Sequence, residues 1–131
     1  MTVKTKCIRD PVDMENDGLR VMIAKYWPKG VNWSSIDMRC IALAPSEGLV
    51  KQWLGHKRLC KKNNDIELLN VGWNDFKNRL MKEYNSNQPK FSHIIEMLRR
   101  INTHSNITLL CNEKDADPYC HRNMVKELIE F

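Results

Sequence analysis

Residues 107–111, with the sequence ITLLC, are the stretch that decides the fold. The run is short, continuously apolar and preceded by polar residues 103–106, which is typical of a strand buried within a parallel sheet. Residues 19–24, LRVMIA, have the same character between Gly18 and the turn sequence WPKG at 27–30, and they predict a central strand. Residues 3–9 predict a first strand, which Asp10-Pro11 ends because proline cannot donate to a sheet.

Helices are predicted between these strands. Apolar residues recur at helical spacing in two segments: Phe76, Leu80 and Tyr84, then Phe91, Ile94, Ile95, Leu98 and Ile101. A short helix is expected from Ser46 to Leu54, with Gly55 as the left-handed residue after its end. Ser34 or Ser35 is expected to cap another short helix that runs through residues 38–43.

A last helix is expected to close the chain. Asp117 is a good N-cap, and Pro118 suits the first helical position. Its apolar stripe consists of Met124, Val125, Leu128 and Ile129. Strands separated by helices predict a compact single α/β domain over residues 1–131, with a largely parallel central sheet flanked by helices.

The composition is that of an ordinary globular domain. The chain has 131 residues, of which 42% are hydrophobic and 28% charged, and this is enough for one core. No run approaches the roughly 20 apolar residues of a membrane helix, and the N-terminus lacks a signal-peptide hydrophobic region. A cytoplasmic protein without membrane association is therefore expected. Five cysteines without the spacing of a disulfide framework predict free thiols.

The middle of the chain carries a basic surplus. The formal net charge is +5, and residues 51–100 contain eleven Lys or Arg against five Asp or Glu. Such a segment attracts nucleic acid through counterion release, or it is simply a solvated surface. The solvated surface is the more common outcome, so nucleic-acid binding is kept as the less favoured alternative.

The predicted catalytic residues lie near the ends of the two strong strands. Ligands in such sheets usually bind beyond the carboxyl ends of the strands, which here lead into residues 25–30 and 112–118. Cys120 lies near a helix N-terminus, where backbone N–H groups favour a thiolate. With His121 and an acid such as Glu113 it forms the residue set of thiol catalysis.

Further side chains are predicted to contact a small, anionic ligand. A first-turn arginine can reach a phosphate or carboxylate, and a lysine beside a glycine lies where the backbone can approach a ligand closely. The predicted ligand-binding residues are Arg122, Lys29, Trp27, Cys111 and Arg20. Cys111, Cys120, His121 and Glu113 are candidate metal ligands, but no CxxC or HxxxH spacing supplies a dedicated tetrahedral set. Zinc binding is therefore kept as a less favoured alternative, and neither a metal nor a cofactor is predicted.

Each candidate also has a structural interpretation. Cys120, Met124 and Leu128 fall at i, i+4 and i+8, so Cys120 can simply begin the core stripe, as buried free cysteines often do. Arg122 can belong to a solvated basic face, and Trp27 can be a core residue between a strand and a proline.

An ordered set of short segments resembles a known family. The segments are Arg9-Asp10-Pro11, DGLRV at 17–21, WPKG at 27–30, LAPS at 43–46, LGH at 54–56 and the strand at 107–111. In this order they are similar to the YeaO-like family, catalogued as domain of unknown function 488, across nearly the whole chain. The resemblance implies a compact α/β fold.

The most specific part of the resemblance lies near the C-terminus. Cys111-Asn112-Glu113, followed by Pro118 and Cys120-His121-Arg122, looks like a cysteine, glutamate and Cys-His-Arg signature of that family. The resemblance implies a site at this signature but no particular activity. This chain departs from the family in two places: it has Ala24-Lys25 where relatives have Asp-Arg, and residues 57–71 look inserted.

Two hypotheses follow from the sequence. The first is a small-ligand or anion-binding site at the Cys-His-Arg motif, with a thiol-dependent enzyme as its most specific form. The second is a non-enzymatic module that binds nucleic acid or protein through the basic segment 51–100, with the motif fastening the last helix.

Overall fold

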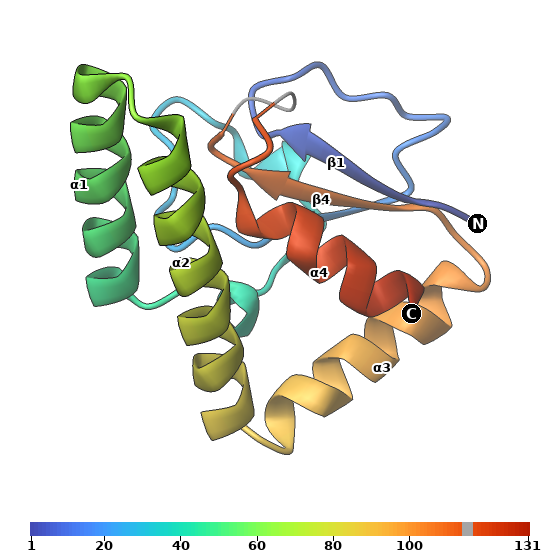
Figure 1. Ribbon diagram of the computed structural model, residues 1–131. Coiled ribbons are helices and arrows are strands. Elements are labelled where there is room, and N and C mark those ends of the chain that lie inside the picture. Colours follow the sequence, from blue (N-terminus) through green and yellow to red (C-terminus); the bar gives the residue numbers. More distant parts are fainter. Residues whose placement is uncertain (114–116) are drawn as a thin grey trace.

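One parallel sheet forms the centre of the protein. The computed structural model describes residues 1–113 and 117–131. Within that part of the chain, four strands pair in the order β1-β4-β2-β3, and every pairing is parallel. The strands are β1 (Val3–Cys7), β2 (Leu19–Met22), β3 (Met38–Arg39) and β4 (Ile107–Cys111). Parallel strands with helices packed against them confirm the predicted α/β class (Figure 1). All of β4 is buried, which confirms the predicted buried strand.

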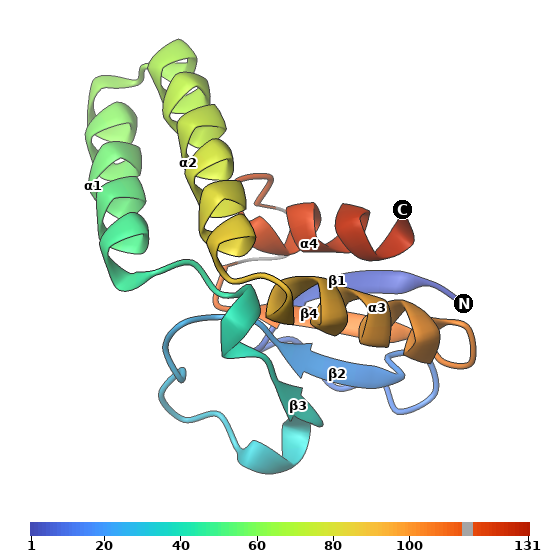
Figure 2. The same cartoon turned by 90° about the horizontal axis from the view of Figure 1, so that it is seen from below.

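Helices cover one face of the sheet and stand beside one end of it. They are α1 (Glu47–Asn63), α2 (Ile66–Ser86), α3 (Lys90–Asn102) and α4 (His121–Glu130). Because α3 and α4 contact each other and both contact β4, they lie on the same face. The helices α1 and α2 form a hairpin beside the end toward which the strand arrows point (Figures 1 and 2). Among the helices described, none has the length and apolar character that crossing a membrane requires.

Buried side chains fill both faces of the sheet. Leu109 belongs to the large core shared with the helices. Its neighbour Leu110 belongs to a smaller cluster on the other face, which Ile8, Val31 and Ile36 from the loops help to cover. Burial on both faces explains why β4 is apolar at four of its five positions.

The helix expected to end at Leu54 continues for two more turns. Gly55 lies inside α1, and the left-handed residue is Asn64, with φ 54°, whose N–H donates to the carbonyls of the last turn. The buried face of α1 continues through Lys57 and Cys60. Burial of this stripe outweighs the helix-breaking tendency of one glycine, which is only about 1 kcal/mol. Residues 57–71 are therefore the tip of the helical hairpin.

Residues 34–43 do not form the expected helix. Two 3₁₀ turns, Trp33–Ser35 and Ile41–Leu43, flank the short strand β3 instead. The Asp37 N–H donates to the Arg20 carbonyl at 2.9 Å, and the Cys40 N–H donates to the Met22 carbonyl at 2.8 Å. These hydrogen bonds to β2 take the backbone groups that a helix would have used.

The last helix begins later than expected. It starts at His121, with Cys120 as its N-cap residue. Asp117 does not cap it, because one carboxylate oxygen accepts from the Tyr119 N–H at 2.9 Å and the other from Lys57 Nζ at 2.8 Å. The proline after Asp117 therefore lies in the turn that precedes the helix.

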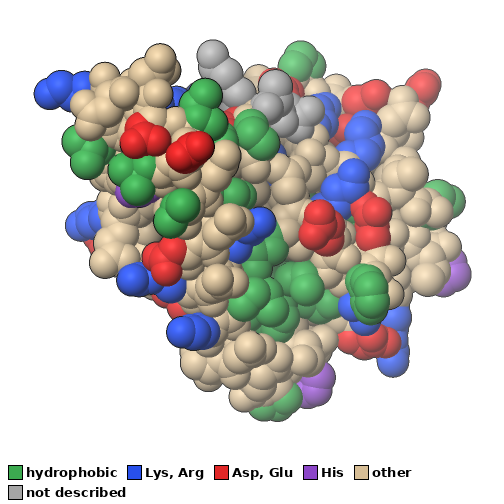
Figure 3. Space-filling view, in the orientation of Figure 1, with side chains coloured by type: hydrophobic (Ala, Val, Ile, Leu, Met, Phe, Trp, Pro, Cys, Tyr) green, Lys and Arg blue, Asp and Glu red, His purple; other side chains and the backbone are tan. Residues whose placement is uncertain are grey.

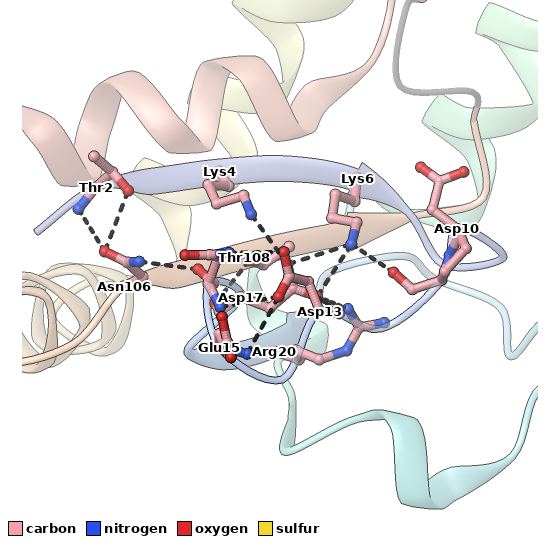
Figure 4. A network of polar contacts seen from close by, with 12 residues as sticks. Thr2, Lys4, Lys6, Asp10, Asp13, Glu15, Asp17, Arg20, Asn106 and Thr108 are labelled. Carbon is pink, nitrogen blue, oxygen red and sulfur yellow. Dashed lines mark hydrogen bonds and ion pairs between the residues drawn. The ribbon is translucent and has the colours of Figure 1, made fainter.

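A buried aspartate ties β1 to β2 (Figure 4). The Asp17 carboxylate, with only 1% of its side chain exposed, accepts from Lys4 at 3.2 Å, from Lys6 at 3.1 Å and from the guanidinium of Arg20. It also accepts from the Asp13 backbone N–H at 3.1 Å. Burial alone would raise the pKa of Asp17, but these hydrogen bonds from N–H groups and cations hold it far below its ordinary value of 3.8.

Gly18 is required where β2 begins, and its replacement by alanine is expected to destabilise the fold by about 2–5 kcal/mol. Its φ is +62°, and an added Cβ would overlap the Asn106 carbonyl oxygen, which accepts the Leu19 N–H that starts the pairing with β4. Urea unfolding of Gly18→Ala checks this. The matched control is Gly55→Ala, where a Cβ meets open space and helix propensity predicts a gain of up to about 1 kcal/mol. Equal effects of the two variants would contradict the prediction.

Candidate functional site

A cavity of about 210 Å³ lies where the parallel strands end. Residues 24–26, which follow β2, and residues 111–113, at the end of β4, line it together. Cys120 and His121 at the start of α4 complete this side. The loops leaving the two strong strands therefore border one cavity, in the position where ligands usually bind in such sheets.

The hairpin supplies an aromatic wall. Trp53 of α1 and Trp73 and Phe76 of α2 line the cavity, together with Tyr119 from the turn before α4. The Trp53 and Trp73 rings lie 5.1 Å apart between centroids, and the Tyr119 ring lies 5.9 Å from Trp53. The Tyr119 hydroxyl donates to Asn70 Oδ1 at 2.7 Å, which fastens the turn to α2. Such a wall suits the apolar body of a small molecule.

Two thiols and an imidazole lie together at the sheet side of the cavity. The Sγ atoms of Cys111 and Cys120 and the Nδ1 of His121 are all within 4.8 Å of one another, and Nδ1 is 4.0 Å from each sulfur. The His121 Nε2 is 2.8 Å from the Ile23 carbonyl oxygen. A carbonyl only accepts, so Nε2 carries a proton, and in the neutral ring the Nδ1 lone pair faces the sulfurs.

The pKa values of the two thiols are shifted in opposite directions. A hydrogen bond from Cys120 lowers the pKa of Cys111 well below its ordinary value, and His121 and the backbone N–H of Glu113 add to this effect while burial opposes it. The same hydrogen bond raises the pKa of Cys120, and burial raises it further. Cys111 is therefore the sulfur that becomes a thiolate first, and Cys120 is its donor.

An ion-pair cluster includes Glu113, one of the residues that line the cavity. Lys57 Nζ of α1 is 2.8 Å from Asp117 and 3.7 Å from Glu113, and only 10% of the Lys57 side chain is exposed. Burial alone would lower the pKa of Lys57, but the hydrogen bond to Asp117 and the charge of Glu113 raise it. The hairpin thus holds both ends of the segment between β4 and α4.

The structure brings four of the predicted site residues to the cavity. They are Cys111, Cys120, His121 and Glu113. Residues 114–116 of the predicted loop lie outside the described part of the chain.

The other predicted residues lie elsewhere. Arg122 is fully buried, and its guanidinium donates to the carbonyls of Glu113 at 2.6 Å and Lys6 at 3.3 Å. Arg20 pairs with Asp17. The Trp27 ring stacks on another tryptophan, with centroids 3.8 Å apart, and Lys29 is exposed. The anionic ligand expected from the sequence therefore has none of these groups at the cavity.

Lys57 and the aromatic wall were not predicted to belong to a site. Lys57 belongs to the basic segment 51–100, for which a solvated surface is the expected outcome. A signal for it exists, because Trp53, Lys57 and Cys60 fall at i, i+4 and i+7 and so share one face of α1. In the sequence the aromatic residues have the spacing of ordinary core residues, and most of them do belong to the hydrophobic core.

The basic middle segment does not form a single positive patch on the face shown in Figure 3. Lys and Arg side chains are interspersed there with Asp and Glu, on the hairpin as elsewhere. Hydrophobic side chains gather instead between the hairpin and α4. Lys57, one of the basic residues of this segment, is paired inside the protein.

A family model matches nearly the whole chain. The model of the DUF488-N3a family, described as the active DUF488-N3 subclade, matches residues 3–131. Neither a curated protein nor a solved structure matches the chain.

Proposed function

Because the chain belongs to the DUF488-N3a family, whose subclade is described as active, we propose that it is a thiol-dependent enzyme that binds a small, largely apolar ligand in the cavity. The observation that carries this proposal is the position of the Cys111 sulfur at the cavity, 4.0 Å from His121 Nδ1. A nucleophile, a base and an adjacent binding space are what such chemistry needs.

Each group has a distinct role in this proposal. Cys111 is the nucleophile, His121 takes its proton on Nδ1, and the Ile23 carbonyl keeps the imidazole oriented. Cys120 donates a hydrogen bond to the Cys111 sulfur. Glu113 stands at the cavity beside Lys57 and contacts the polar part of the ligand. The apolar body of the ligand packs against the rings of the hairpin.

Thiol labelling tests this assignment. Chelator-treated, reduced protein is mixed with iodoacetamide at neutral pH, and each cysteine is followed by mass spectrometry. Cys111 is expected to react first and at least about tenfold faster than Cys60, a buried thiol in α1 whose pKa is raised by burial. His121→Gln is expected to slow the labelling of Cys111. Equal rates for Cys111 and Cys60 would contradict the proposal.

A second arm tests whether the cavity is the route to the sulfur. Val50 of α1 lines the cavity and is half-buried, so Val50→Trp should fill part of the space and slow labelling. The matched control is Leu59→Trp, on an exposed position of the same helix. If both variants label like the unmodified protein, the cavity is not the binding space.

A further inference from the structure

We propose that Cys111, Cys120 and His121 bind one zinc ion and leave a fourth coordination position on the cavity side. This inference rests on the same cavity as the proposed function, but the zinc-bound protein is a separate state, because the ion occupies the Cys111 sulfur and the His121 Nδ1 that thiol catalysis needs free. It is carried by the spacing of the three donor atoms, by the orientation of the imidazole and by the place of all three residues in the lining of the cavity.

The donor atoms are already close to the separation that zinc requires. With Zn–S about 2.3 Å and Zn–N about 2.0 Å, tetrahedral angles place neighbouring donors about 3.5–3.8 Å apart. Here His121 Nδ1 is 4.0 Å from each sulfur, and no pair of donors exceeds 4.8 Å. Each nitrogen–sulfur distance therefore has to shorten by about 0.5 Å, and the sulfur–sulfur distance by no more than about 1 Å, to bring the three atoms around a common ion.

The imidazole is oriented as a metal ligand. In zinc sites the nitrogen that does not bind the metal usually donates to a carboxylate or backbone carbonyl, which fixes the tautomer and the ring plane. His121 Nε2 makes this contact with Ile23 at 2.8 Å. The Nδ1 lone pair therefore points toward the sulfurs before any ion is bound.

The donor chemistry selects the class of metal. Two thiolates and one imidazole are soft and borderline donors, which suit zinc and not magnesium or calcium, since those ions require oxygen ligands. Two thiolates also balance the charge of Zn²⁺ inside a mostly apolar cavity. Binding displaces the thiol protons, so the ion converts the unequal thiol pair into two equivalent ligands.

The fourth position faces the ligand space. All three donors line the cavity, so a water molecule or a polar atom of the ligand can complete the tetrahedron from that side. Three protein ligands with one open position are the arrangement of catalytic zinc sites, whereas structural sites use four protein ligands.

The spacing of the three donors in the sequence does not match a common zinc-binding motif. Cys120 and His121 are adjacent, and they converge because Cys120 has extended backbone angles, φ −137° and ψ 138°, while His121 begins a helix. Cys111 reaches them from the end of β4. No common zinc spacing in a sequence describes a set built from a strand end and a helix start.

Cobalt substitution tests the site in the full-length protein. The chain is reduced, freed of metal with a chelator and titrated with Co²⁺ and then with Zn²⁺. The expected result is one equivalent of Co²⁺ with the visible bands of a tetrahedral thiolate site, displaced by Zn²⁺. Cys111→Ser, Cys120→Ser and His121→Gln are expected to weaken binding at least about 100-fold. Cys60→Ser, which removes a buried thiol outside the cluster, should bind Co²⁺ like the unmodified protein.

Protection of the cysteines by zinc can be measured in the unmodified protein, so this test does not depend on how the variants fold. One equivalent of Zn²⁺ is expected to slow iodoacetamide labelling of Cys111 and Cys120 together, because metal-bound sulfur is a poorer nucleophile. Folded protein that gives no tetrahedral Co²⁺ spectrum, or zinc that protects neither cysteine, overturns the inference. If Cys111 is reactive but no metal binds, the zinc site is contradicted and the thiol mechanism stands. If metal binds but Cys111 of the metal-free protein is unreactive, the thiol mechanism is contradicted and the zinc site stands.

Discussion

Asp17→Asn is expected to lower the free energy of unfolding by about 3–5 kcal/mol, the usual cost of removing one partner from a buried ion pair. The substitution leaves the guanidinium of Arg20, whose side chain is only 5% exposed, without its carboxylate. Lys4 is about one-third exposed and should contribute little, because solvent screens its charge. Urea unfolding at neutral pH measures the loss.

The same substitution is expected to change the response to acid. The pKa of Asp17 is lower in the folded protein than in the unfolded chain, so its contribution is fully present above the unfolded value of about 4 and is lost as the pH falls toward the folded value. The stability of the unmodified protein should therefore fall in acid more steeply than that of Asp17→Asn, and the two should converge.

Asp75→Asn is the control for both measurements. Asp75 also pairs with an arginine, Arg79, but its side chain is 60% exposed. An exposed helical pair contributes about 0.5 kcal/mol or less. Parallel acid curves for the unmodified protein and Asp17→Asn would show that Asp17 does not carry this stability.

Arg122→Met is expected to lower the free energy of unfolding by about 2–4 kcal/mol, because it removes a fully buried guanidinium and leaves two part-buried carbonyl oxygens without their charged donor. Arg122 donates to Glu113 and to Lys6, so it joins the chain after β4 to the end of β1. Arg122→Lys should recover only part of the loss, since one ammonium group cannot reproduce the guanidinium fork. Thermal and urea unfolding measure these effects.

The arginine substitution should also disturb the site. The anchored Glu113 follows Cys111 by two residues, and Arg122 directly follows His121, so loosening this contact should slow the labelling of Cys111. Lys126→Met, one helical turn further along α4 and partly exposed beside Glu130, is the matched control. A stable Arg122→Met protein with unchanged Cys111 labelling would show that Arg122 does not position the site.

The sequence predicts the elements whose burial is local and repetitive. The strand β4 is apolar at four of its five positions and buried at all of them, so its pattern has one interpretation. The helices α2 and α3 carry apolar residues at regular spacing and were predicted for that reason. The two loops that meet at the cavity follow from the parallel direction of β2 and β4.

The parts of the fold and of the site that the sequence does not predict depend on contacts between residues that are far apart in the chain. Asp117 has the character of an N-cap, but Lys57 of the hairpin takes its carboxylate, and α4 begins later as a result. Gly55 looks like a helix end, but burial beyond it extends α1. The roles of the two cysteines depend on how Cys120 and His121 turn toward Cys111, which their spacing does not reveal.

The contact between His121 and the Ile23 carbonyl joins residues 98 positions apart. The acceptor nitrogen is therefore aimed at the sulfurs only after the start of α4 has packed beside the residue that follows β2, and this contact is absent from an unfolded chain. An ion that occupies the assembled cluster stabilises the native state by up to about 2.7 kcal/mol at a hundredfold excess over its Kd, and binding of the ion to cysteines of the unfolded chain reduces this gain. The lifetime of the protein in the cell would then depend on how much of it has an occupied cluster, because molecules with an empty cluster unfold and are cleaved by proteases more often.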